Sequence, residues 1–481
     1  MSNDALINPT AEAALLGAMM LDVALVTELS DKVLPEDFGD PLHGRIYSAM
    51  LRFSAKNLRA DAITLRPVFA NDSDAQYGAY LDQLTEAPAI VAAAPALADQ
   101  IADLAARRKA REAMRDAMTA LHEDLDRPVD EICGQVESAG WAAAHRTKVD
   151  VVYDLGDLVG LVEDRDDRIN EDPGAVGMTN ALVSDIDKAL GPLEAGTYNL
   201  FAGRPGMGKS SAAMSLALGY AINGHGGLYL QHEMTAEQMA LRATSDMAHA
   251  MGCKLPHAAL KKGGLRAVDR QDLARVRERI GLLPLRLICP GPIDLRRVWS
   301  LAAQHRAMFK AQGRKLDFIV LDQLILIGAH DEEGRYIQDD RKRMNVVSAG
   351  IKRLAHEMDV AVLALAHLSR GVEARQSKRP ILSDLKESGN LEQDADTVTL
   401  LYREEYYLKA SEPKRGEKDV KGRDLHEDWE AEMSVARGKL DLIFAKNRHG
   451  NSSTRTVKFL GEFSAVRAGD FDEFDPDPLL F

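Results

Sequence analysis

The sequence has few cysteines, no long apolar segment and no surplus of basic residues. Its three cysteines, Cys133, Cys253 and Cys289, are odd in number and far apart, so they support neither a disulfide framework nor a zinc site. We therefore expect buried, reduced thiols. No apolar run approaches the roughly 18 residues that a membrane span needs, and residues 1–9 lack the basic and apolar regions of a signal peptide. We expect a cytoplasmic protein with no membrane partner.

The net charge of −14 argues against a protein that coats duplex DNA with a generally basic surface. A narrow basic channel remains compatible with this charge. Part of the negative charge is local, because residues 470–481 hold five carboxylate side chains and no basic residue. We expect this tail to be a disordered, solubilising segment, and docking into the basic-rimmed groove of a partner is the alternative.

The chain is long enough for two or three folded domains, with 481 residues of which 46% are hydrophobic and 28% charged. Residues 1–125 predict a small helical domain, because apolar positions within residues 11–121 recur at helical spacing. Residues 126–173 predict a linker with a charged helix at residues 159–170. Residues 174–481 predict the largest domain.

Basic residues cluster near the end of the helical domain, at Arg107, Arg108, Lys109 and Arg111. Such a run usually forms a solvated helix face, and no aromatic residue is interleaved with it. A nucleic-acid contact is the alternative for this cluster.

Residues 174–481 predict an α/β fold with a mostly parallel sheet covered by helices. Apolar runs typical of buried strands alternate there with helical patterns, which is the arrangement of a parallel sheet. The strand-like runs are residues 198–202, 227–230, 285–289, 318–321 and 360–366.

A phosphate-binding pattern, G-x-x-x-x-G-K-[ST], lies between a strand-like run and an Ala- and Leu-rich helix, the context that it requires. Glycines let backbone N–H groups turn toward an anion, and the helix adds the positive end of its dipole. We expect ATP here, with Lys209 contacting phosphate and the Ser210 hydroxyl binding Mg²⁺. The candidate nucleotide-binding residues are Gly203, Arg204, Pro205, Gly206, Met207, Gly208, Lys209, Ser210 and Ser211.

Two acidic residues follow strand-like runs and are candidates for the chemistry. Phosphoryl transfer needs a carboxylate near the metal and a group that orients the attacking water, both beside the phosphate loop. Asp322 ends the run at 318–321 and is the candidate metal acid. Glu233 follows the run at 227–230 and is the candidate base, and a first-turn acid of the next helix is its alternative.

Three stretches together make the chain resemble the DnaB family of hexameric replicative helicases, which are RecA-like P-loop ATPases. They are residues 203–210, residues 233–238 (E-M-T-A-E-Q) and residues 383–396 (S-D-L-K-E-S-G-N-L-E-Q-D-A-D). The resemblance covers nearly the whole chain, because L-P-E-D-F at residues 34–38 and other short matches resemble the helical amino-terminal domain of the family.

The resemblance implies a catalytic role for several residues. Lys209 and Ser210 would bind phosphate and Mg²⁺, Glu233 would be the catalytic base, and Asp322 would be the Walker B acid. Residues 445–450 resemble a stretch whose Lys and Arg reach the ATP site of the neighbouring subunit. Lys446 would therefore act in trans, and Arg448 would be an arginine finger.

The family places two loops per subunit along a central channel for single-stranded DNA. These match Arg370 and, in the signature stretch, Lys386, Glu387 and Gly389. One departure is His367, which stands where the family usually has the Gln that senses the terminal phosphate. We expect its charge to change near neutral pH. Gln323 and the residues after it also depart from the usual Walker B run.

The family resemblance implies an ATP-dependent replicative DNA helicase that translocates 5′ to 3′ as a hexameric ring on single-stranded and forked duplex DNA. Primase and a helicase loader are the expected partners, in a bacterial cell or a phage-infected bacterium. The alternatives are a recombinase-type ATPase and a DNA-bound ring or regulator that uses ATP only as a ligand. Residues 409–437 are charged and poorly patterned, and we expect an exposed loop without an assigned function.

Overall fold

The computed structural model divides the chain into two compact units, Met1–Gly160 and Leu161–Phe481. It describes residues 6–469 except 31, 55, 57, 70–75, 87–90, 127–128, 130–131, 137–139, 141–154, 172–175, 332–334, 386–388, 419–422 and 449. The acidic tail at residues 470–481 therefore lies outside the described residues.

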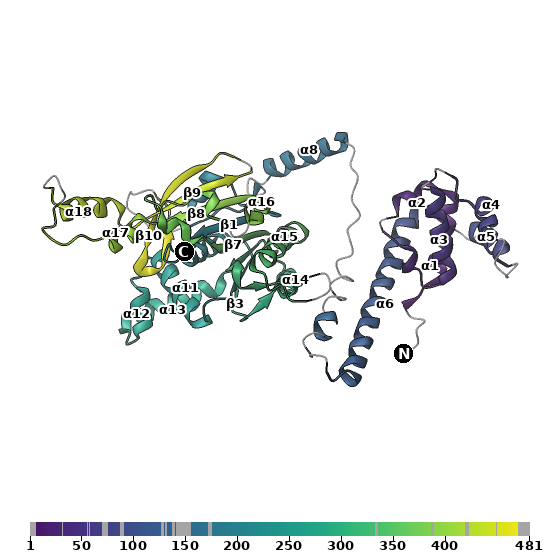
Figure 1. Cartoon of the computed structure of the whole chain (residues 1–481), viewed down its shortest axis with the longest axis horizontal. Helices are drawn as coiled ribbons and strands as arrows, with labels where there is room; N and C mark the ends of the chain where they lie inside the picture. The colour runs from purple at the N-terminus through teal and green to yellow at the C-terminus, as the bar shows by residue number, and fades with distance from the viewer. Residues whose placement is uncertain are drawn as a thin grey trace. The chain divides into compact units, whose positions relative to one another are not determined.

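The first unit is all helical in its described residues, as the sequence predicts (Figure 1). Its core is formed by fully buried apolar side chains such as Leu15, Met19 and Ile46, which recur at helical spacing on the inner faces of these helices. The longer elements are α1 (Pro9–Leu21), α2 (Ala24–Glu28), α3 (Pro41–Ser54), α4 (Ala62–Leu65), α5 (Gln76–Glu86) and α6 (Ala94–Glu123).

The basic cluster on α6 makes contacts within the first unit. Arg108 donates hydrogen bonds to the backbone oxygens of Leu6, at 2.6 Å, and of Asp37. Arg107 forms an ion pair with Asp103 one turn earlier, at 2.7 Å. Part of the cluster thus holds the segment before α1 and the turn at Asp37 against α6.

Nine strands of the described part of the second unit form a single sheet, in the order β11-β10-β9-β8-β1-β7-β5-β2-β3. The strands from β8 to β3 in this order pair in parallel, and β9, β10 and β11 pair antiparallel. Their bounds are β1 (Tyr198–Gly203), β2 (Gly227–Gln231), β3 (Leu285–Ile288), β5 (Phe318–Asp322), β7 (Ala361–His367), β8 (Thr397–Tyr402), β9 (Lys439–Asn447), β10 (Ser453–Leu460) and β11 (Ala465–Arg467). The mostly parallel α/β fold is confirmed.

The five predicted strands are β1, β2, β3, β5 and β7, each within two residues of its predicted bounds. All six residues of the central strand β1 are buried, as expected for a parallel strand covered on both faces. The helices of this unit are α8 (Leu155–Glu171, which begins in the first unit), α9 (Ser184–Leu190), α10 (Lys209–Ile222), α11 (Ala236–Ala250), α12 (His257–Lys262), α13 (Ala267–Leu282), α14 (Leu295–Ala311), α15 (Asp340–Met358), α16 (Gly389–Asp394), α17 (Glu404–Ala410) and α18 (Leu425–Ala436). A short parallel pair, β4 (Ile293–Asp294) and β6 (Ile327–Gly328), lies outside the main sheet.

The expectation of an unpatterned loop at residues 409–437 is wrong for the described part of that stretch. It contains the end of α17 and the whole of α18, which extend beyond the sheet (Figure 1). The Asp424 carboxylate caps α18 by accepting from the backbone N–H of His426 at 2.9 Å. The Trp429 indole donates to the backbone oxygen of Leu408 at 2.8 Å and joins the two helices. The high charge of this stretch hid these local signals.

All three cysteines are free, but only part of the expectation of buried thiols holds. Cys253 is buried and Cys289 is half-buried, whereas Cys133 is exposed. The expectation of a buried thiol is therefore wrong for Cys133. No helix in the described part of the chain is long and apolar enough to cross a membrane.

Candidate functional site

The predicted phosphate loop connects the end of β1 to the start of α10. Gly206 and Gly208 have positive φ angles of 83° and 88°, which glycine adopts without strain. A Cβ atom at either position would also lie 2.6 Å from a ring atom, of Tyr406 and of Phe459 respectively. Both the backbone conformation and the aromatic cover therefore require glycine at these positions.

The Lys209 side chain folds back along this loop. Its Nζ atom donates to the backbone oxygen of Gly203 at 2.7 Å and to that of Arg204 at 3.3 Å. Burial lowers the pKa of Lys209 to about 8, and the nearby carboxylates of Asp322 and Glu233 act in the opposite direction. The ammonium group thus lies at the loop with both candidate acids close to it.

The Asp322 carboxylate is buried at the end of β5. Its Oδ2 atom accepts hydrogen bonds from the Tyr229 hydroxyl and from Gln231 Nε2, both at 3.0 Å. Burial raises the pKa of Asp322, and hydrogen bonds from Ser210, Tyr229 and Gln231 oppose that shift. The two candidate Mg²⁺ ligands, Ser210 and Asp322, therefore lie close to each other.

Glu233 lies between β2 and α11, outside the helix. The N-cap of α11 is Thr235, and the acid in its first turn is Glu237, so the alternative role of Glu233 as a first-turn acid is excluded. One carboxylate oxygen of Glu233 accepts a hydrogen bond from Gln323 Nε2 at 2.8 Å. Sequence reasoning noted Gln323 only as a departure from the usual Walker B run, although its side chain holds the candidate base.

His367 ends β7, directly beside Gly203 in the register of the sheet. Part of the ring faces solvent, but desolvation and the positive charges of Lys209 and Arg204 lower the pKa of His367 to about 4. The imidazole is therefore neutral at physiological pH. The expectation that its charge changes near neutral pH is wrong, because the phosphate loop brings two cations close to it.

Arg204 connects the phosphate loop to the segment that carries Arg370. Its guanidinium donates to the backbone oxygen of Leu368 at 3.0 Å and to the Glu373 carboxylate at 2.9 Å. Arg370 lies between these two acceptors in the sequence. It begins the short 3-10 helix Arg370–Ala374, which contains Glu373. The sequence placed Arg204 only among the nucleotide-binding residues and did not indicate this second set of contacts.

The start of the signature stretch, which carries the other candidates for DNA contact, lies next to the Arg370 segment. The backbone N–H of Ser369 donates to the oxygen of Asp384 at 3.0 Å, which joins this segment to the start of the signature stretch. Gly389 is the first residue of α16. Lys386 and Glu387 lie outside the described residues.

Lys446 and Arg448 lie at the opposite edge of the sheet from the phosphate loop. Asn447, between them, pairs with Thr397 at the amino end of β8, and Thr397 pairs with Asn199 near the start of β1. The four residue steps of β1 from Asn199 to Gly203 cover about 13 Å at 3.3 Å per residue, which is longer than either side chain. Neither side chain can therefore reach the phosphate loop of its own chain.

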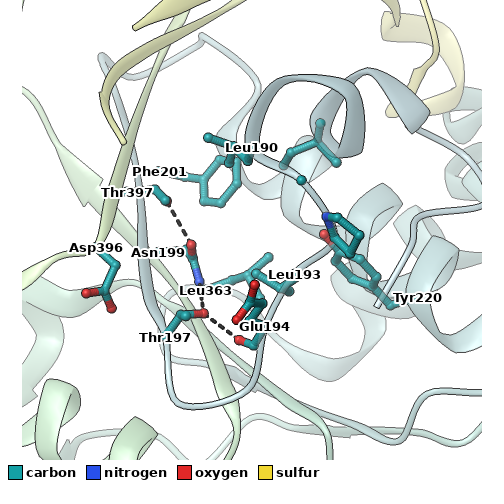
Figure 2. Close-up of a pocket in the computed structure, with 13 residues that line it drawn as sticks. Leu190, Leu193, Glu194, Thr197, Asn199, Phe201, Tyr220, Leu363, Asp396 and Thr397 are labelled. Carbon is teal, nitrogen blue, oxygen red and sulfur yellow. Dashed lines mark hydrogen bonds between the residues drawn. The ribbon is translucent and has the colours of Figure 1, made fainter. Parts of the chain in front are cut away.

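A cavity opens at this same amino edge (Figure 2). A chain of hydrogen bonds crosses it from Thr397 to Asn199 at 2.8 Å, on to Thr197 at 2.9 Å, and then to the oxygen of Glu194 at 2.6 Å. Its other walls are mainly apolar and come from Leu190, Leu193, Phe201, Tyr220 and Leu363. None of the residues that line it belongs to the predicted phosphate loop, so this cavity is not the predicted nucleotide site.

The structure thus brings the phosphate loop, Ser210, Asp322, Glu233 and His367 together at the carboxyl ends of the parallel strands. That edge is where ligands bind in open α/β sheets. Among the described residues, no group of three or more His, Cys, Asp or Glu side chains is arranged to hold a metal ion. A cation here would need oxygen atoms from the nucleotide and water in addition to Ser210 and Asp322.

Comparisons with protein families cover both parts of the chain. Residues 177–468 match the model of the DnaB-like helicase C terminal domain. Residues 4–103 match the model of the DnaB-like helicase N terminal domain.

Individual relatives are similar along nearly their whole length. The chain is 30% identical to the replicative DNA helicase DnaB of Rickettsia prowazekii, over 95% of this chain and 93% of that protein. It is 29% identical to the replicative DNA helicase DnaB of Rickettsia bellii, over 92% and 89% of the two chains. Among solved structures, it shares the fold of a DnaB-like replicative helicase studied for its interactions with primase, with a TM-score of 0.61, 24% identity, and coverage of 96% of this chain and 100% of that one.

Proposed function

Since the chain belongs to the DnaB family of replicative DNA helicases, and so is an ATP-dependent DNA helicase, we propose that its ATP site is completed by the next subunit of a ring. The observation that carries this proposal is the separation of the two edges of the sheet. One edge holds the phosphate loop and both acids, and the other holds Lys446 and Arg448. Because the chain belongs to this family, we set aside the recombinase-type and regulator alternatives.

The nucleotide would lie along the phosphate loop, with its phosphates on the backbone N–H groups at the start of α10. Lys209 would exchange its bonds to backbone oxygens for charge-assisted bonds to phosphate. The hydroxyl of Ser210 and the carboxylate of Asp322 offer hard oxygen donors side by side, which fits Mg²⁺. When bound, Mg²⁺ would neutralise charge on the phosphate oxygens.

Glu233 would orient the attacking water and accept its proton. Gln323 holds one of its carboxylate oxygens at 2.8 Å and leaves the other for water. His367 is neutral and can donate one hydrogen bond toward the terminal phosphate from the end of β7. These three side chains would therefore respond to the presence of that phosphate group.

Arg448 would stabilise the charge that develops on the phosphoryl group in the neighbouring subunit, with Lys446 beside it. The length of β1 supports this trans action, because it keeps both side chains away from their own loop. Hydrolysis would then depend on assembly, because a lone subunit lacks the guanidinium at its phosphates. We propose a hexamer, the assembly typical of the family.

Single-stranded DNA would pass through the ring along Arg370, Lys386, Glu387 and Gly389. A few cations and backbone amides from each copy are enough to hold a phosphate chain, although each subunit is acidic overall. The contacts of Arg204 with Leu368 and Glu373 would pass the state of the phosphate loop to the Arg370 segment. Translocation would run 5′ to 3′ and expel the complementary strand.

We also propose primase and a helicase loader as partners, in the cytoplasm of a bacterial cell or of a phage-infected bacterium. The relatives that support this proposal are bacterial replicative helicases. The three-part division into residues 1–125, 126–173 and 174–481 remains our proposal for the domain organisation, with the first part forming a collar on the ring.

The test combines ATP hydrolysis with and without single-stranded DNA and unwinding of a forked duplex. We expect DNA to stimulate hydrolysis and the fork to be unwound only with hydrolysable ATP. Stimulated hydrolysis without unwinding would favour a recombinase-type activity, and neither activity would favour a regulator. Imaging with a non-hydrolysable ATP analogue and single-stranded DNA would give the stoichiometry and show whether Arg448 approaches the neighbouring nucleotide.

A further inference from the structure

The short helix α16 connects two regions to which the proposed function gives different tasks. Its first residue, Gly389, follows directly on the loop proposed to contact DNA. Its last turn lies against Lys446 and Arg448, the residues proposed to act on the neighbouring ATP. The six residues of α16 span only about 9 Å at 1.5 Å per residue, so movement at one end is transmitted to the other.

Lys446 caps the carboxyl end of α16. Its ammonium group donates to the backbone oxygens of Glu392, of Gln393 at 3.2 Å, and of Ala395 at 2.7 Å. The last carbonyls of a helix have no partner within the helix, and a cation there also faces the negative end of its dipole. The cap therefore ties the end of β9 to α16.

Arg448 is held at the same place by two of its nitrogens. Nη1 donates to Asp396 Oδ1 at 3.1 Å, and Nη2 donates to the backbone oxygen of Gln393 at 2.8 Å. The Arg448 side chain is nevertheless 46% exposed. Its remaining N–H groups are accessible from outside the subunit, as a group acting on a neighbour requires.

Asp396 is the fixed part of this arrangement. Its carboxylate is nearly buried, and its second oxygen accepts from Lys352 Nζ at 2.6 Å and from the backbone N–H of Tyr198 at 2.8 Å. The backbone oxygen of Asp396 also accepts from the N–H of Arg448 at 3.1 Å. Asp396 is thus anchored to β1 and α15 on one side and holds the guanidinium on the other.

We propose that Asp396 and the carboxyl end of α16 form a seat that positions Arg448 toward the neighbouring subunit's ATP, and that the α16 part of this seat shifts against the fixed Asp396 when the loop before α16 binds DNA. Asp396 is a positioning residue, because it touches Arg448 and not the nucleotide. The inference rests on the proposed trans action of Arg448 and adds its regulation. DNA held by one subunit would thereby set the rate of hydrolysis at the next.

Mixed rings separate an effect on the neighbour from an effect within the subunit. Glu233→Gln removes the proposed base, so in rings of Glu233→Gln and wild-type subunits only the wild-type sites hydrolyse ATP. Some of these sites receive Arg448 from a Glu233→Gln subunit. Adding Asp396→Asn to the Glu233→Gln subunit alters only the seat that serves a wild-type neighbour.

We expect the doubly substituted subunits to slow DNA-stimulated hydrolysis at adjacent wild-type sites by roughly tenfold, because a small misplacement of a catalytic group has effects of this order. The KM for ATP at those sites should stay within about twofold, since the wild-type phosphate loop is intact. The ratio of hydrolysis rates with and without single-stranded DNA should fall as well. Ring assembly, measured by mass photometry, should match that of Glu233→Gln alone.

Two matched controls use neighbouring residues. Glu357→Gln removes a carboxylate from α15 that pairs with Arg353 and not with Arg448, and it should leave adjacent wild-type sites unchanged. Lys352→Met removes the other ionic partner of Asp396 and keeps the Arg448 contact. Because it loosens one anchor of Asp396, it should slow the neighbour less than Asp396→Asn does, with some loss of thermal stability.

Equal rates with and without Asp396→Asn would overturn the seat, and so would equal slowing by Lys352→Met. Arg448→Ala in the same assay tests the proposed function separately. If Arg448→Ala slows adjacent wild-type sites and Asp396→Asn does not, the trans action of Arg448 is supported and the positioning role of Asp396 is wrong. If neither does, the trans action itself is wrong. A neighbour effect that is the same with and without DNA would remove the coupling to DNA.

Discussion

The two edges of the central sheet differ in how completely their functional groups are set by their own subunit. At the carboxyl edge, Lys209, Asp322 and Glu233 each have hydrogen-bond partners that place them around one loop. At the amino edge, Lys446 and Arg448 are equally well held but have no phosphate loop of their own within reach. Under the proposed function, the difference means that one subunit carries all the parts of a hydrolytic site without completing one.

The largest expected effect is the loss of ATP binding at the carboxyl edge. Lys209→Ala should abolish measurable ATP binding, because it removes the charge that lies along the phosphate loop. Equilibrium binding of a fluorescent ATP analogue measures this effect. Thermal unfolding without nucleotide should be nearly unchanged, and tight binding by the variant would show that the loop is not the nucleotide site.

Glu233→Gln should separate binding from chemistry at the same edge. We expect kcat to fall by about 10³-fold, while ATP-dependent ring formation is retained. The amide keeps the shape and can still contact Gln323, but it cannot accept a proton from water. Single-turnover hydrolysis and sizing with ATP measure the two properties, and a kcat equal to that of the wild type would refute the assignment of the base.

Arg448→Ala tests whether the amino edge serves a neighbour. Fully substituted rings should lose about 10³-fold or more in kcat, as expected for an arginine finger. In mixtures with wild-type subunits, activity should fall faster than the share of wild-type protein. A linear decline would contradict the proposal that Arg448 acts on a neighbouring subunit.

Gln323→Leu tests whether the position of Glu233 matters at the carboxyl edge, since it removes the side chain that holds Glu233 and changes no charge. We expect kcat to fall by about tenfold, equivalent to roughly 1.4 kcal/mol, with little change in the affinity for ATP. Steady-state kinetics with ATP titration checks this split. A change in affinity alone would place Gln323 at the nucleotide and not at the base.

The smallest expected effect concerns His367. Its pKa of about 4 lies below the unperturbed value of 6.5, so the ring stays neutral as pH rises through the physiological range. The ratio of unwinding rates of wild type and His367→Gln should therefore be constant between about pH 6 and about pH 8. Because the pKa of His367 is lower in the folded state than in the unfolded state, protonation of the ring favours unfolding. The stability that the neutral ring contributes is therefore lost as pH falls from 6.5 toward 4. A ratio that changes across neutral pH would show that the charge of His367 does change there.

Sequence patterns predicted the carboxyl edge better than the amino edge for a physical reason. The phosphate loop is a continuous stretch flanked by buried strands, and Asp322 and Glu233 each follow such a strand, so local patterns carry these residues. The antiparallel strands β9 to β11 were not predicted, although β9 alternates buried and half-buried residues, which is the pattern of a strand with one face on the core.

Contacts between distant residues lay beyond local patterns. The bond between Gln323 and Glu233 spans 90 residues, and that between Arg448 and Asp396 spans 52. Periodicity and motif spacing report on short stretches only and carry no information on such pairs. The resemblance to a family supplied the candidates Arg448 and Lys446, but only the register of the sheet separates them from their own phosphate loop.

The aromatic cover over the phosphate loop has a consequence for how this protein can be altered. Arg403 donates to the oxygen of Gly206 at 3.2 Å and stacks on the Phe459 ring, so the base of the α17 and α18 hairpin belongs to the loop's surroundings. Residues toward the hairpin's tip have no such ties to the loop among the described contacts. A fluorescent label or a fused reporter should therefore be tolerated at the tip. Shortening the hairpin past Tyr406 would instead remove the ring that covers Gly206.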